Sequence, residues 1–183
     1  SVLLNVVFMT KKLHFYFTHK EQAKSTNRII IPGYQLRRNL YQDFPITPND
    51  IVFLGDSHTE MFPFNDFLQN PNIINRGIAG ENTSEGLRTL NTILKGYPKT
   101  IVIELGINDF FGKISGDSTI KNINEMIYKI HKRSPKTDIY LTSLFPTSLT
   151  IEGTKHSAHP HTVAINAKLR EIARVNAITY IDV

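Results

Sequence analysis

Short apolar runs alternate with longer amphipathic stretches from residue 51 to residue 183, and this alternation constrains the fold more than any other feature. The predicted strands are residues 51–54, 72–75, 99–105, 138–142 and 178–183. The predicted helices are residues 34–44, 83–95, 118–133 and 160–175. Strands that alternate with helices favour right-handed βαβ units. The sequence therefore predicts an α/β domain with a parallel sheet covered by helices on both faces.

The length and the charge of the chain limit the classes of protein to consider. A chain of 183 residues is long enough for one domain with a sizeable core. We assign residues 34–183 to that domain and residues 1–33, of mixed aromatic and basic character, to an N-terminal extension of unclear structure. The net charge of +5 comes from scattered Lys and Arg, so we expect no nucleic-acid partner. No apolar run approaches the length of a membrane span.

The chain contains no Cys, which excludes disulfides, thiolate nucleophiles and zinc sites built on Cys. The lack of Cys does not determine the compartment. The chain begins with Ser and a short apolar stretch, "SVLLNVVFM", which fits either a signal-peptide remnant or a first element of the fold. The compartment stays open, with a secreted or periplasmic location preferred.

Three segments rich in Gly and small polar residues follow the first three predicted strands. They are "GDSH" at 55–58, "NRGIAGENTSEG" at 75–86 and "GIND" at 106–109. In a parallel sheet the ligand site lies beyond the carboxyl ends of the strands. We therefore expect these three segments to converge in space and to hold the functional residues.

The residue types in these segments suit acyl transfer, which needs a nucleophile, a base and donors for the oxyanion. Ser57 lies where a helix should begin, so its hydroxyl and backbone N–H are available. Gly80 can bring its N–H close to a substrate because it has no Cβ, and Asn108 offers a side-chain amide. Each residue alone is better explained as a helix cap or a turn residue. All three in order at strand ends favour a site.

The segments "FLGDSHTE", "NRGIAGENTSEG" and "ELGINDF" resemble blocks I, II and III of the SGNH-hydrolase family, the GDSL-type esterases and lipases. The resemblance extends over residues 34–183, and it is greatest to bacterial acylhydrolases grouped with platelet-activating-factor acetylhydrolase-like and carbohydrate acetylesterase members. It implies a flavodoxin-like three-layer α/β/α sandwich with a five-stranded parallel sheet, here without its C-terminal element. The general nucleophile elbow G-x-S-x-G is absent.

The resemblance also implies roles for individual residues. Ser57 would be the nucleophile, and the oxyanion hole would consist of the N–H groups of Ser57 and Gly80 and the side chain of Asn108. Asp56 and Asp109 would support them. The family needs no metal and no organic cofactor, so we expect neither.

The general base is missing from its expected place. The family's fourth block, D-x-x-H, follows the fifth strand by some tens of residues, and this sequence ends at Val183. We therefore expect the sequence to stop short of the natural C-terminus. We also expect the 183-residue chain to have little hydrolytic activity and the complete gene product to be an esterase.

The remaining base candidates are His156, His159 and His161, in the segment after the fourth predicted strand. His58 is adjacent to Ser57, and neighbouring side chains on a helix diverge. The spacing of the three later histidines matches no zinc signature. Asp182 comes too early for the family's Asp and is assigned a structural or substrate-facing role.

The favoured function is hydrolysis of a small-molecule ester with a short acyl group, first an acetyl group on a carbohydrate and next a lipid or thioester. The alternative is a non-catalytic protein that binds a carbohydrate or an anion and has lost its base. A nucleotide-binding protein is the least favoured, because G-x-G-x-x-G and the P-loop Lys are absent. The oligomeric state stays open.

Overall fold

The structure is a computed structural model that describes residues 33–146 and 158–183. The strands are β1 (Ile51–Gly55), β2 (Ile73–Asn75), β3 (Thr100–Glu104), β4 (Asp138–Thr142) and β5 (Thr179–Ile181). The helices are α2 (Tyr34–Asp43), α3 (Ser57–Met61), α4 (Phe64–Leu68), α5 (Thr83–Ile93), α6 (Ile107–Phe111), α7 (Gly116–Arg133) and α8 (Ala158–Val175). All five predicted strands are present.

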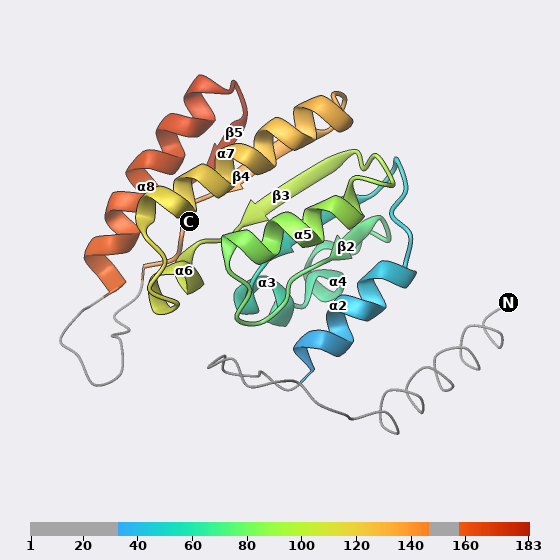
Figure 1. The fold of residues 1–183 in the computed structure, drawn as a ribbon. Helices are drawn as coiled ribbons and strands as arrows, with labels where there is room; N and C mark the ends of the chain where they lie inside the picture. Colours follow the sequence, from blue (N-terminus) through green and yellow to red (C-terminus); the bar gives the residue numbers. More distant parts are fainter. Residues whose placement is uncertain (1–32, 147–157) are drawn as a thin grey trace, which may run out of the picture.

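The strands form one parallel sheet in the order β2-β1-β3-β4-β5. Helices α5, α7 and α8 lie side by side on one face of it (Figure 1). The connection from β1 to β2 runs across the sheet in the opposite direction from the later connections, so right-handed crossover places α3 and α4 on the other face. This confirms the predicted flavodoxin-like α/β/α sandwich.

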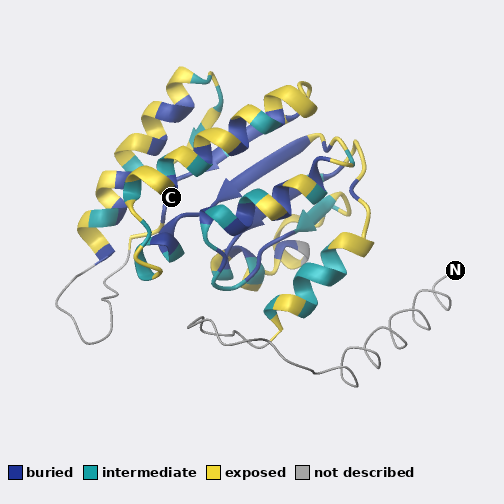
Figure 2. Cartoon of the chain, viewed as in Figure 1, coloured by how far each residue is buried: buried dark blue, intermediate teal, exposed yellow. Residues whose placement is uncertain are grey.

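The core lies between the central strands and the helices that cover them. All residues of β3 are buried, which confirms the prediction that this strand is covered on both faces (Figure 2). Helix α7 places Ile123, Met126, Ile127 and Ile130 against the sheet at helical spacing. Full burial of one such side chain contributes about 1.5–3 kcal/mol. This core holds the carboxyl ends of the strands in place.

Helices α2 and α5 begin at their predicted residues, whereas α7 and α8 begin earlier than predicted. Helix α5 is capped by Asn82, which forms a capping box with Glu85. Helix α7 begins two residues earlier than predicted. Helix α8 begins at Ala158 and holds Pro160 in its first turn, where the missing N–H costs little.

The sequence did not reveal α4 and α6, because five residues are too few to show a helical period. Strand β5 is shorter than predicted and only partly buried. Within 33–146 and 158–183, no helix has the length and apolar character that a bilayer crossing needs. The predicted extension lies outside the described residues apart from Gly33, so its boundary stays a prediction.

Candidate active site

Ser57 is the first residue of α3, immediately after β1. The helix is capped by the fully buried Asp56, whose carboxylate accepts the backbone N–H of His58 at 3.0 Å. The Ser57 hydroxyl is therefore not needed as a cap. It is half-buried and forms no hydrogen bond to another residue in the described parts of the chain. A hydroxyl in this position is free to react with a ligand.

The side chain of Asn108 connects the three predicted segments. Its Nδ2 donates to Oδ2 of Asp56 at 3.2 Å and to the carbonyl oxygen of Glu81 at 3.1 Å. Asp56 precedes Ser57, and Glu81 follows Gly80. The residues after β1, β2 and β3 therefore meet at one place, as predicted.

The segment after β2 is also attached to α3. Gly80 has a φ of 78°, a left-handed conformation that favours glycine. The N–H of Ala79, one residue earlier, donates to the carboxylate of Glu60 in α3. The Gly80 backbone is thus held beside the helix that begins with Ser57.

Asp109, the residue after Asn108, connects three helices through its side chain. It is fully buried and accepts hydrogen bonds from the N–H of Thr83 at 2.8 Å, the hydroxyl of Thr83 at 2.6 Å and the hydroxyl of Thr119 at 3.1 Å. These bonds tie α6 to the starts of α5 and α7. They also fix the backbone next to Asn108, and the supporting role of Asp109 stays a prediction.

Glu81 is a buried acid that the sequence analysis did not single out. Burial raises the pKa of its carboxyl to about 7, although the hydroxyl of Thr89 and the charge of Arg38 oppose the shift. Arg38 Nη2 lies 2.8 Å and Thr89 Oγ1 lies 2.6 Å from Oε1. The ion pair between Arg38 and Glu81 attaches α2 to the residue that follows Gly80.

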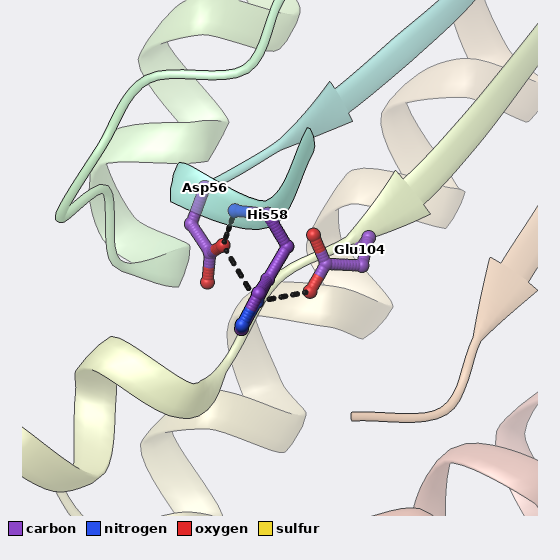
Figure 3. A group of neighbouring side chains, drawn as sticks. All are labelled: Asp56, His58 and Glu104. Carbon is purple, nitrogen blue, oxygen red and sulfur yellow. Dashed lines mark hydrogen bonds and ion pairs between the residues drawn. The ribbon is translucent and has the colours of Figure 1, made fainter. Parts of the chain in front are cut away.

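A second buried acid, Glu104, ends β3 and faces His58 (Figure 3). Its Oε2 accepts the hydroxyl of Thr59 at 2.8 Å. The Nδ1 of His58 lies 3.7 Å from Glu104 Oε1 and 3.3 Å from Asp56 Oδ1. Burial, with the charge of Asp56, raises the pKa of Glu104 to about 8. A Glu in the apolar run "TIVIEL" was the signal in the sequence for this group.

Comparison with known proteins places the chain in a family. The model of the GDSL-like Lipase/Acylhydrolase family matches residues 53–183. The chain belongs to this family. It is therefore a GDSL-type ester hydrolase by class. No curated protein sequence matches the chain.

Solved structures of similar fold come from several bacteria. A GDSL-like lipase from Bacteroides thetaiotaomicron is 22% identical with a TM-score of 0.68, over 81% of this chain and 77% of that one. A Streptococcus pneumonia protein, proposed to be a platelet activating factor, is 22% identical with a TM-score of 0.71, over 81% and 74%. The esterase EstA from Pseudoalteromonas is 20% identical with a TM-score of 0.57, over 74% and 77%. At these identities the likeness supports the fold alone.

The histidines of this GDSL-type hydrolase that lie within residues 33–146 and 158–183 form no hydrogen bond with the Ser57 hydroxyl. His159 and His161 lie in the first turn of α8 and not in a loop, because that helix begins at Ala158. The ring of His161 packs on Phe110, with centroids 4.9 Å apart, and burial lowers its pKa. His156 lies outside the described residues. In the described ranges, no hydrogen bond joins the Ser57 hydroxyl to a histidine.

Asp182, directly after β5, forms an ion pair at the surface. Its carboxylate accepts from Arg170 Nη2 at 2.6 Å, and both side chains are exposed. Of the two roles considered for Asp182, structural or substrate-facing, this ion pair fits the structural one.

Proposed function

We propose that this protein is a serine ester hydrolase in which Ser57 attacks the acyl carbonyl of a short-chain ester. An acetyl group on a carbohydrate is the first candidate substrate, and a lipid or thioester is the next. The observation that carries the proposal is the double hydrogen bond of Asn108 to Asp56 and to the Glu81 carbonyl. It supports a common site for Ser57, Gly80 and Asn108.

The reaction has two steps. The Ser57 oxygen bonds to the carbonyl carbon while its proton passes to a base, and the oxyanion then expels the alcohol, which takes up that proton. Water next attacks the acyl-Ser57 ester, releasing the carboxylic acid and restoring the Ser57 hydroxyl. No oxidant or reductant is consumed.

The oxyanion would be bound by the N–H groups of Ser57 and Gly80 and by Asn108. The Asn108 amide donates at 3.1 and 3.2 Å in the free protein, which are long hydrogen bonds. A charged oxyanion is a stronger acceptor than the carbonyl oxygen of Glu81. One amide hydrogen of Asn108 could therefore turn toward the oxyanion as the negative charge develops.

The base remains a prediction, with His156, His159 and His161 as candidates. His161 has one supporting feature, because its Nε2 is buried and has no hydrogen-bond partner among the described residues. Its lowered pKa favours the neutral ring that a base requires. Its packing against Phe110 means that the ring would have to turn to reach Ser57.

The test is covalent labelling of Ser57 together with hydrolysis of p-nitrophenyl acetate. A fluorophosphonate should add one phosphonate group to Ser57, detected by mass spectrometry of the peptides. Ser57→Ala should lose the adduct and any turnover, while Ser118→Ala, a change of an exposed serine on α7, should retain both. Labelling and turnover that are equal in Ser57→Ala and the unaltered chain would refute the proposal.

A non-catalytic protein that binds a carbohydrate or an anion is the second candidate. The lack of a histidine bonded to Ser57 in the described residues favours it. Binding of an acetylated sugar, with no phosphonate adduct on Ser57 after long incubation, would select this alternative.

A further inference from the structure

Three side chains with metal-ligating atoms converge between the carboxyl ends of β1 and β3. Asp56, His58 and Glu104 each contribute one ligand atom, and these atoms all lie within 4.8 Å of one another. The His58 ring stands between the two carboxylates, with Nδ1 facing both (Figure 3). The proposed reaction assigns no role to His58 or Glu104.

We propose that Asp56, His58 and Glu104 bind a divalent transition-metal ion, with Zn²⁺ the best match. Imidazole nitrogen and carboxylate oxygen lie about 2.0–2.2 Å from zinc, so two ligands of a tetrahedral ion are about 3.3 Å apart. The distance from His58 Nδ1 to Asp56 Oδ1 is 3.3 Å, and the distance to Glu104 Oε1 is 3.7 Å. Glu104 Oε1 would have to move a few tenths of an ångström closer to Nδ1 to reach this spacing, and the two carboxylate oxygens lie within 4.8 Å of each other.

The second oxygen of each carboxylate is already held by a neighbouring donor. Asn108 donates to Oδ2 of Asp56, and Thr59 donates to Oε2 of Glu104. Both carboxylates therefore direct the other oxygen toward His58. Donors that orient ligating carboxylates in this way are typical of metal sites.

The backbone that carries the ligands is rigid. Gly55 of β1 pairs with Glu104 of β3 in the sheet, and Asp56 directly follows Gly55. Asp56 also caps the helix that contains His58, so all three ligands are attached to one piece of hydrogen-bonded framework. A site on such elements needs little reorganisation to bind an ion.

The site has more carboxylate oxygens than its single imidazole donor can satisfy. Two buried carboxyl groups face His58, and in the described ranges His58 is the single basic side chain within ion-pairing distance of either. The one Nδ1 can donate one proton, to one carboxylate at a time. A divalent ion can bond to both carboxylates and to Nδ1 together.

The ion would have access to solvent. The His58 side chain is 54% exposed, although both carboxylates are buried. Three protein ligands beside an open side leave a fourth position for water, as in zinc sites that are not purely structural. The ring of Phe145, 5.0 Å from that of His58 between centroids, would limit the opening.

The test is titration of the chelator-treated 183-residue chain with Zn²⁺ by isothermal calorimetry, compared with three variants. His58→Gln and Glu104→Gln should each weaken zinc binding more than about tenfold. His131→Gln, a change of an exposed histidine near the end of α7, should bind as the unaltered chain does. Excess Mg²⁺ should not displace Zn²⁺, because Mg²⁺ prefers six oxygen ligands.

The outcomes separate clearly. One equivalent of Zn²⁺ that is lost in both variants supports the site, and a visible Co²⁺ spectrum of the tetrahedral kind would support its geometry. No zinc binding by the unaltered chain, or binding that persists in His58→Gln, overturns it and leaves an ordinary ion pair. Melting curves show whether Glu104→Gln is folded. If it is not, His58→Gln decides alone, because His58 is half-exposed.

Discussion

The carboxylate of Asp109 accepts both the backbone N–H and the hydroxyl of Thr83, at 2.8 and 2.6 Å. Both residues are fully buried. Thr119 adds a third donor from α7. One side chain thus holds the starts of α5 and α7 against the short helix that carries Asn108.

We expect Asp109→Ala to lower the free energy of unfolding by about 3 kcal/mol, because it leaves buried donors without an acceptor. Asp117→Ala is the matched control on α7, since Asp117 is 91% exposed and its ion pair with Lys168 should contribute less than about 1 kcal/mol. Urea denaturation of both variants measures the difference. Equal losses would contradict a structural role for Asp109.

Asn108→Ala should lower kcat for ester hydrolysis by about 10²–10³-fold, because it removes one oxyanion donor. This expectation rests on the proposed function. Asn124→Ala removes an exposed amide that donates to the carbonyl oxygen of Ile120 within α7, and it should leave kcat unchanged. Steady-state kinetics of both variants measures the effect. A raised KM with kcat intact would mean that Asn108 binds the substrate but does not stabilise the oxyanion.

Gly77→Ala should destabilise the protein by about 1–3 kcal/mol through overpacking. A Cβ at Gly77 would lie 2.3 Å from the backbone N of Glu60, so α3 and with it Ser57 would have to move. Gly116→Ala is the control, because the nearest atom there is the flexible Ile165 Cδ1 at 3.2 Å. Thermal melts should show a clearly larger drop in Tm for Gly77→Ala, and similar drops would argue against the close contact.

Glu81 should make stability depend on pH. Below about pH 4.5 its carboxyl is protonated in both the folded and the unfolded chain. Between about 4.5 and 7 the folded chain keeps the proton and the unfolded chain releases it, so the free energy of unfolding falls as pH rises. Above about pH 7 the stabilisation that Glu81 contributes at low pH is absent; its size is on the order of 3 kcal/mol.

Glu81→Gln isolates this effect from the other acids. The free energy of unfolding of the variant minus that of the unaltered chain should be larger at pH 8 than at pH 5. The reason is that the amide of the variant stays neutral at both values. Urea denaturation at the two pH values measures the double difference. A difference of zero, or one of opposite sign, would mean that the ion pair with Arg38 outweighs the burial of Glu81.

Much of the fold could be predicted from local patterns. The β-branched run that forms β3 and the apolar stripe of α7 each extend over several residues. Buried apolar residues repeat along a helix with its period and fill a strand that is covered on both faces, so both elements can be recognised in the sequence. The short helices α4 and α6 and the cap at Asn82 escaped the prediction. Five residues show no period, and several neighbouring polar residues compete for one cap position.

The candidate site could also be predicted from the sequence only in part. The sequence alone determined that Ser57, Gly80 and Asn108 follow successive strands, because polar residues after apolar runs mark the carboxyl edge of a parallel sheet. Only the tertiary structure decided that Glu104 faces His58, that Asn108 bonds to two other segments and that His161 packs on Phe110. Those contacts depend on strand order and register, which join residues dozens of positions apart and leave no local pattern in the chain.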